Sequence, residues 1–217
     1  MPAPSPEIQR CWIKRVKPVA FTACLIPVAL LIWRSATDTL GAEPIETITF
    51  TTGDWALRML MITLAITPLR QLTGWHVLIR LRRMFGLYAF FYALLHFTTY
   101  IVLDQFFAWQ FILEDIAARP YILMGFTAFV LLIPLAATST DRMLQRLGGK
   151  RWQRLHRLAY AVPILGVLHF LWLVKADITE PAIYALVLFV LLGYRIARYR
   201  RRRSSQAIAG MPKRVAL

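Results

Sequence analysis

Long apolar blocks alternate along this chain with short polar connections that carry most of its charged residues. Blocks of roughly 17 to 23 apolar residues are long enough to cross a bilayer as helices, and no strand periodicity interrupts them. The pattern predicts six such helices, at about residues 16–33, 55–69, 84–103, 121–138, 151–174 and 181–197. We therefore expect an all-α, polytopic membrane protein whose fold is a single six-transmembrane-helix bundle.

The ends of the chain are polar and divide it into three parts. We expect residues 1–15 to form a cytoplasmic N-terminal segment, residues 16–198 the transmembrane domain, and residues 199–217 a basic cytoplasmic tail that is disordered after Arg203. The first apolar block follows a run of basic residues, as the hydrophobic region of a signal peptide also does. A retained helix is favoured, because cleavage would remove one of an even number of spans.

Composition supports a membrane protein and changes the meaning of the net charge. Hydrophobic residues make up 58% of the 217 residues, and the mean hydropathy is +0.54. A formal net charge of +15 would favour a nucleic acid partner if the protein were soluble. Here the basic residues lie between apolar blocks, so membrane topology explains them and no nucleic acid partner is expected.

The basic residues are divided unevenly between the two sides of the predicted bundle. Most of the 26 lysines and arginines fall at the N-terminus, in the loops after the second and fourth helices, or in the C-terminal tail. The exceptions are Arg34, Arg58, Arg119 and Lys175, on the side that carries most of the 11 acidic residues. The positive-inside rule therefore predicts that both termini are cytoplasmic.

The two cysteines, Cys11 and Cys24, do not indicate a disulfide. On the predicted topology Cys11 lies in the reducing cytoplasm. The chain also lacks the CxxCH motif, so a haem would not be attached through that motif.

Two of the four histidines fall inside predicted helices at nearly equal depth. His96 lies thirteen residues after Arg83 and His169 twelve after Arg157. Both are therefore expected roughly 18 to 20 Å from the cytoplasmic boundary, at 1.5 Å per helical residue. An ionisable residue inside a membrane segment suggests function, and neutral imidazole is a common metal ligand. Two imidazoles at one depth on different helices can hold one haem iron from its two faces. The alternative is that each histidine is hydrogen-bonded between helices.

Small and aromatic residues surround the predicted histidine pair. Gly86, Ala89, Ala93 and Gly166 offer places where a planar ring can approach a helix backbone. The phenylalanines and tyrosines between residues 85 and 100 can pack on a porphyrin, although ordinary helix packing explains each of them as well.

His156 lies at the cytoplasmic boundary, and three roles for it are open. It can ligate a second haem, orient a flavin, or cap the basic turn. A second haem lacks an evident opposite ligand, because the third helix presents Arg82 and Arg83 at that depth and His76 lies on a loop. Pro163 can kink the helix between His156 and His169. One haem is the simpler expectation, and two haems are the alternative.

In its motifs and their spacing the chain resembles the MsrQ (YedZ) family, within the wider ferric-reductase-like transmembrane group. The resemblance covers roughly residues 15–200 and rests on the order and spacing of short stretches. These stretches are Ile66–Leu69, Leu78–Arg83, Gly86–Leu87, Leu95–His96, Arg119–Tyr121, Thr138–Thr140, Trp152–His156, and His169 with Trp172.

The resemblance implies a function that the residue pattern alone does not reach. It implies haem b, FMN binding, and location in the bacterial inner membrane. It also implies electron delivery to a periplasmic molybdenum-containing partner, MsrP, which reduces methionine sulfoxide in oxidised periplasmic proteins. The residues that match the family's haem ligands are His96, His156 and His169. The chain would then be an electron-transfer subunit rather than the catalytic subunit.

The sequence also bears on the electron donor and on two alternative functions. The chain has no GxGxxG fingerprint for a dinucleotide, so electrons are expected from quinol in the quinone pool or from a separate cytoplasmic flavin reductase. A self-sufficient metalloreductase would need a chelating cluster in the outer loops, where the acidic residues are scattered. A transporter without a redox cofactor would be expected to show internal repeats, and none is convincing.

Overall fold

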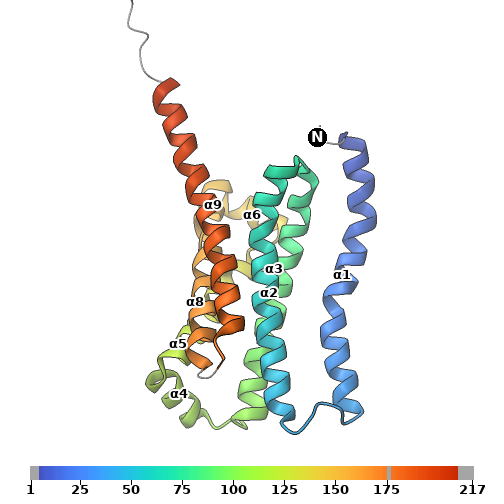
Figure 1. The fold of residues 1–217 in the computed structure, drawn as a ribbon, viewed down its shortest axis with the longest axis vertical. Helices are drawn as coiled ribbons and strands as arrows, with labels where there is room; N and C mark the ends of the chain where they lie inside the picture. Colours follow the sequence, from blue (N-terminus) through green and yellow to red (C-terminus); the bar gives the residue numbers. More distant parts are fainter. Residues whose placement is uncertain (1–4, 175–176, 210–217) are drawn as a thin grey trace, which may run out of the picture.

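The structure, a computed structural model, describes residues 5–174 and 177–209, and every regular element within these ranges is helical. Long helices run side by side in the bundle (Figure 1). They are α1 (Pro6–Ala36), α2 (Pro44–Thr73), α3 (Ile79–Thr99), α5 (Pro120–Ala137), α8 (Leu158–Leu173) and α9 (Thr179–Ala209). Short elements connect them: η1 (His76–Leu78), η2 (Tyr100–Asp104), α4 (Trp109–Ala118), α6 (Asp141–Leu147) and α7 (Gly149–Leu155).

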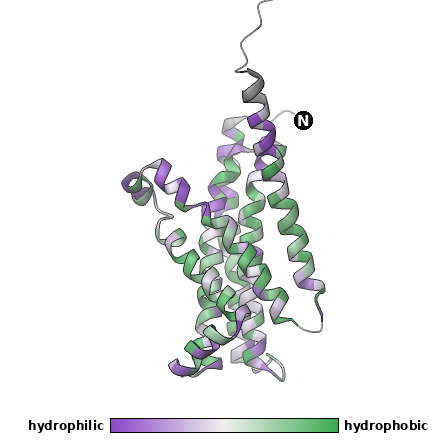
Figure 2. Ribbon diagram, turned by 90° about the vertical axis from the view of Figure 1, so that its left-hand side faces the viewer, coloured by the Kyte–Doolittle hydropathy of each residue, from purple (hydrophilic) through white to green (hydrophobic). Residues whose placement is uncertain are grey.

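The connecting elements lie at the two ends of the bundle. Figure 1 shows the start of α1, the helix α6 and the end of α9 at one end, and the α1–α2 connection and α4 at the opposite end. Hydrophobic residues dominate the middle of the long helices, while hydrophilic residues gather toward the ends (Figure 2). This distribution is the one expected of a protein that crosses a bilayer.

Five helical segments of the described chain are long and apolar enough to cross a membrane. They are Glu7–Ala36, His76–Asp104, Pro120–Ala137, Gly149–Leu173 and Thr179–Arg201. They correspond to five of the six predicted spans, and large apolar side chains on them face outward, as Val19 (69% exposed) and Phe189 (76%) do. The predicted span without a counterpart among the five is the one at residues 55–69, which lies in α2. Helix α2 packs on α3 but carries Asp54, Arg58 and Arg70.

Helix α2 is longer than the apolar pattern predicts. It begins at Pro44 rather than near residue 55, because proline suits the first helical turn. It ends at Thr73, and the following Gly74, with φ 72°, is its C-cap. Threonine hydroxyls in the added turns bond to backbone carbonyls four residues earlier, as Thr52 does to Ile48 at 2.8 Å. Gly53 and Asp54, which precede the predicted span at about residues 55–69, therefore lie inside a helix.

Two other segments expected to lack regular structure are helical. The connection after η2 contains α4, which has strong helix formers and an Asp115–Arg119 ion pair of 3.0 Å one turn apart. Helix α9 continues through the arginine run to Ala209, so the disorder expected after Arg203 is wrong as far as Ala209. Residues 210–217 of the predicted tail lie outside the described residues, and so does Lys175, one of the four basic residues assigned to the side opposite the termini.

The fifth predicted helix is interrupted between the two histidines it carries. Helix α7 ends at Leu155, and α8 begins at Leu158. The turn between them uses hydrogen bonds over three residues, including Arg157 N–H to the Arg154 carbonyl at 3.3 Å. The break in the α-helical hydrogen-bond pattern therefore lies at His156 and Arg157, whereas the buried Pro163, the expected kink, is accommodated within α8.

Polar side chains join the long helices across the apolar interior. Tyr92 is fully buried and donates to the Cys24 carbonyl at 2.6 Å, which ties α3 to α1. Arg195 of α9 donates to the Leu64 carbonyl of α2. Pro68 has no N–H with which to bond that carbonyl in the helix, so Arg195 occupies an acceptor that the proline leaves free. Cys11 and Cys24 are both free thiols.

Candidate functional site

The structure brings His96 and His169 together from different helices. His96 lies in the last turn of α3 and His169 near the end of α8, and their ring centroids are 6.2 Å apart with an angle of 77° between the planes. Both side chains are partly buried. The chain directions place the pair toward the end of the bundle at which α4 lies (Figure 1).

Both histidines use the same ring nitrogen to bond to a backbone carbonyl of a neighbouring helix. Nδ1 of His96 lies 2.9 Å from the Thr49 carbonyl oxygen of α2, and Nδ1 of His169 lies 2.6 Å from the Tyr121 carbonyl oxygen of α5. A carbonyl oxygen can only accept, so each Nδ1 carries the hydrogen. Each Nε2 is therefore left as a neutral acceptor, which is the form in which imidazole binds a metal.

A glycine lies against each ring. A Cβ atom on Gly53 of α2 would be 3.0 Å from Nδ1 of His96, and one on Gly125 of α5 would be 2.8 Å from Nδ1 of His169. Both distances are shorter than an ordinary van der Waals contact. The two helices thus approach the imidazole rings at positions where no side chain intervenes.

The spacing of the rings fits two imidazoles on opposite sides of one metal ion. Two metal–nitrogen bonds of roughly 2 Å, with about 1.1 Å from each nitrogen to its ring centre, require ring centres about 6 Å apart. Among the described residues, no group of three or more His, Cys, Asp or Glu side chains is arranged to hold a metal ion. The pair therefore suits a metal whose remaining ligands come from a cofactor, and haem iron is such a metal.

His156 lies in a different environment, at the junction of α7 and α8. Its ring stacks on Trp152 with centroids 3.8 Å apart, and its Nε2 lies 3.0 Å from the Thr138 hydroxyl. That hydroxyl donates its hydrogen to the Pro134 carbonyl at 2.6 Å, so it accepts from His156. His156 therefore uses Nε2 as a donor, the opposite of His96 and His169.

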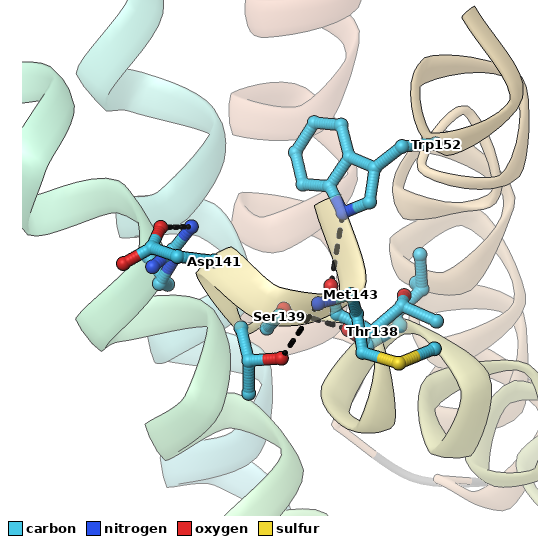
Figure 3. Close-up of polar contacts among 8 residues, drawn as sticks. Thr138, Ser139, Asp141, Met143 and Trp152 are labelled. Carbon is cyan, nitrogen blue, oxygen red and sulfur yellow. Dashed lines mark hydrogen bonds and ion pairs between the residues drawn. The ribbon is translucent and has the colours of Figure 1, made fainter. Parts of the chain in front are cut away.

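The turn beneath His156 is held by further contacts. Figure 3 shows the Trp152 indole pointing at the loop that holds Thr138, and Trp152 Nε1 donates to the Thr138 carbonyl at 2.9 Å. The Thr140 hydroxyl caps α6 by accepting from Met143 N–H at 3.2 Å. Arg83 of α3 contacts Asp141 at 2.8 Å, and this hydrogen bond and charge hold the pKa of the exposed Asp141 carboxyl below its ordinary value.

Several residues singled out in the sequence lie away from the histidine pair. His76 is exposed at the start of η1. Gly86 and Gly166 face α2, where a Cβ would meet Thr63 at 3.8 Å and Leu57 at 3.4 Å respectively. Two of the phenylalanines on α3 pack against α5, with Phe97 stacked on Phe129 at 4.6 Å and Phe90 on the same ring at 6.0 Å.

Sequence reasoning did not find the partners of the two histidines. Gly53 and Gly125 supply the space, and the carbonyls of Thr49 and Tyr121 supply the acceptors. A backbone carbonyl is present at every residue and leaves no signal in a sequence. The one usable signal is a glycine inside a helical apolar pattern, which is unfavourable for a helix unless close packing requires it.

Comparison with known proteins identifies the class to which the chain belongs. Residues 52–167, which contain Gly53, His96, Gly125 and His156, match the family described as "Ferric reductase like transmembrane component". The chain therefore belongs to the ferric-reductase-like class of membrane proteins. No solved structure matches the chain at a significant level.

Curated relatives define the family more narrowly. A protein from Herminiimonas arsenicoxydans is 52% identical over 198 residues, which are 90% of this chain and 91% of the relative. Proteins from Xanthomonas axonopodis pv. citri (52%, 90% of this chain and 92% of the relative) and Xanthomonas campestris pv. campestris strain 8004 (55%, 83% and 85%) are similar. Each is named "Protein-methionine-sulfoxide reductase heme-binding subunit MsrQ". The chain belongs to the MsrQ family.

Proposed function

We propose that this chain is the haem-binding membrane subunit of a protein-methionine-sulfoxide reductase, and that His96 and His169 are the two axial ligands of a b-type haem. The single observation that carries the proposal is the geometry of the pair. The ring centroids lie 6.2 Å apart with the planes nearly perpendicular, and each Nδ1 is already bonded to a carbonyl. The names of the relatives support haem and the reductase system.

The residues of the chain would hold the cofactor and set its properties. When bound, haem supplies an iron that gains and loses one electron reversibly. His96 and His169 would ligate it through Nε2, while the Thr49 and Tyr121 carbonyls hold the rings in the required tautomer. The pair lies toward the end of the bundle opposite the start of α1 and the end of α9, and a partner on that side would be close to a haem held there.

The topology and partners are further parts of the proposal. Six spans, of which α2 is not among the five most apolar segments, would put both termini on the same side of the membrane. The basic residues near the termini support the cytoplasm of a bacterium as that side and the inner membrane as the location. The resemblance to the MsrQ family supports a periplasmic, MsrP-like molybdoprotein as electron acceptor, and quinol or a cytoplasmic flavin reductase as donor. Binding of FMN, and ligation of a second haem by His156, rest on that resemblance and stay predictions.

Spectroscopy of the purified full-length protein tests the haem proposal. The protein is expected to show the absorption and electron paramagnetic resonance signals of low-spin haem. His96→Ala and His169→Ala should each remove the low-spin signal while the protein stays in the membrane fraction. His76→Ala, at an exposed residue away from the pair, is the control and should leave the signal intact. Retention of the full low-spin signal in either His96→Ala or His169→Ala would show that the proposed pairing is wrong.

A further inference from the structure

The two histidines are held by the same local arrangement, repeated on two pairs of helices. His96 of α3 bonds to the carbonyl of Thr49 on α2, and Gly53 lies four residues after that threonine. His169 of α8 bonds to the carbonyl of Tyr121 on α5, and Gly125 lies four residues after that tyrosine. In both cases a carbonyl at one position and a glycine one helical turn later form the contact surface for one imidazole.

The spacing of four residues has a geometric reason. In an α-helix the carbonyl of one residue points toward the N–H of the residue four positions later. A second donor that reaches this carbonyl from the side must therefore pass close to the Cβ position of that later residue. Alanine at the later position would compete for the space that the histidine nitrogen occupies.

The distances show how severe the conflict would be. The three heavy atoms nearest to a Cβ on Gly125 all belong to His169, with Nδ1 at 2.8 Å, Cε1 at 3.0 Å and Cγ at 3.1 Å. The three nearest to a Cβ on Gly53 all belong to His96, with Nδ1 at 3.0 Å, Cε1 at 3.1 Å and Cγ at 3.7 Å. An added methyl group would thus displace the histidine ring before it met any other atom, and more strongly at Gly125.

We propose that Gly53 and Gly125 are positioning residues for the axial ligands. Their missing side chains allow each Nδ1 to reach its carbonyl, and thereby keep each Nε2 directed at the metal. The inference rests on the proposed haem ligation by His96 and His169. Neither glycine touches the cofactor in this role; each acts through the histidine beside it.

Substitution by alanine tests the role, and the chain offers matched controls. Gly86 of α3 and Gly193 of α9 also lie inside helices, but a Cβ there would meet only Thr63 at 3.8 Å or nothing within 4 Å. Gly53→Ala and Gly125→Ala should lower haem affinity by roughly 10- to 100-fold, the range seen when a group that orients a metal ligand is altered, with the larger loss at Gly125. Gly86→Ala and Gly193→Ala should bind haem and give low-spin signals as the unchanged protein does.

A second comparison separates ring positioning from a general folding defect. Because the Cβ on Gly125 meets His169 first, the double variant Gly125→Ala/His169→Ala should be as thermally stable, without haem, as His169→Ala alone. Additional destabilisation in the double variant would mean that the methyl group meets other parts of the bundle, and would overturn the positioning role.

The outcomes also distinguish this inference from the proposed function. Loss of the low-spin signal in the histidine variants, together with unchanged haem affinity in Gly53→Ala and Gly125→Ala, would refute the glycine inference alone. Retention of the signal in the histidine variants would refute the haem ligation and the inference that rests on it. Loss in both sets, with intact controls, supports both.

Discussion

The histidine pair and His156 show how the same side chain is prepared for two different uses. His96 and His169 donate from Nδ1 to backbone carbonyls, which leaves Nε2 of each ring as the unprotonated nitrogen, and the two ring centroids lie 6.2 Å apart. His156 donates from Nε2 to Thr138 and stacks on Trp152. Nε2 therefore carries no hydrogen in His96 and His169, whereas in His156 it carries the hydrogen that is donated to Thr138.

This difference shows that the position of a histidine along a helix does not by itself decide which ring nitrogen is left to bind a metal. The partner of the second ring nitrogen selects the tautomer and so decides which nitrogen can bind a metal. At the pair, carbonyls on α2 and α5 impose one tautomer on both rings. At His156, the hydroxyl of Thr138 imposes the other, because its own hydrogen bonds to Pro134.

The largest expected effect comes from removing one histidine from each region. His169→Ala should reduce low-spin haem by at least roughly 10- to 100-fold, since an axial ligand is lost. His156→Ala should leave that haem spectrally normal, because the side-chain contacts of His156 are with Thr138 and Trp152 and not with the pair. Absorption and electron paramagnetic resonance spectra on the two variants measure this. If His156→Ala also abolished the low-spin signal of the His96–His169 haem, the two regions would not be independent.

The hydroxyl that selects the tautomer of His156 gives the next effect. Thr138→Val leaves the Nε2–H of His156 without its acceptor at a buried site, which should cost about 1–3 kcal/mol of unfolding free energy. Thr127→Val on the same helix removes the same kind of hydroxyl-to-carbonyl bond, at 2.7 Å to Leu123, without involving a histidine. Chemical denaturation in detergent should show the larger loss for Thr138→Val. Equal losses would mean that the histidine contact contributes nothing.

A smaller effect is expected from the indole that closes the turn. Trp152→Phe keeps an aromatic ring against His156 but removes the Nε1–H bond to the Thr138 carbonyl, worth about 0.5–1.5 kcal/mol. The exposed Trp109 of α4, replaced by Phe, serves as the control. Thermal unfolding should separate the two variants, while the haem spectrum stays unchanged in both. An altered spectrum in Trp152→Phe would connect the turn to the histidine pair.

The smallest effect is a pH dependence at the end of the bundle near His156. Arg83 holds the pKa of Asp141 below its ordinary value, so the folded state favours the ionised carboxylate. The stabilisation is therefore present above the unfolded pKa of about 3.9 and is lost as the pH falls through the lower folded pKa. The difference in thermal stability between the unchanged protein and Asp141→Asn should be small at pH 7 and vanish in acid. A difference that grew as the pH fell would contradict the assigned direction.

The long helices could be predicted from the sequence because burial in a bilayer requires long apolar runs. Five of the six predicted spans correspond to segments that are apolar and long enough to cross a membrane. The helix bounds were less accurate where polar residues continue a helix. In α2 the added turns contain threonines that bond to the helix backbone, and in α9 they contain arginines, which are strong helix formers.

The pairing of His96 with His169 also followed from the sequence, since residue counts from basic boundaries give similar depths at a fixed helical rise. The break between α7 and α8 could not be predicted from the sequence, where Pro163 was the only visible cause of a kink. The turn at His156 depends instead on contacts with Thr138 and Trp152. The contacts of Thr138 with Trp152 and His156 connect residues 14 and 18 positions apart in the chain, which become neighbours only when the end of α5 lies against the turn between α7 and α8.

By itself, then, the sequence determined the helices, the charge asymmetry and the two histidines at one depth, because these depend on local hydrophobicity and regular spacing. Only the tertiary structure decided which ring nitrogen each histidine uses. That choice depends on carbonyls of Thr49 and Tyr121, which any residue type would supply, and on the absence of side chains at Gly53 and Gly125. A neighbouring helix must be in place before a backbone carbonyl can select a tautomer or a missing Cβ can make room for a ring.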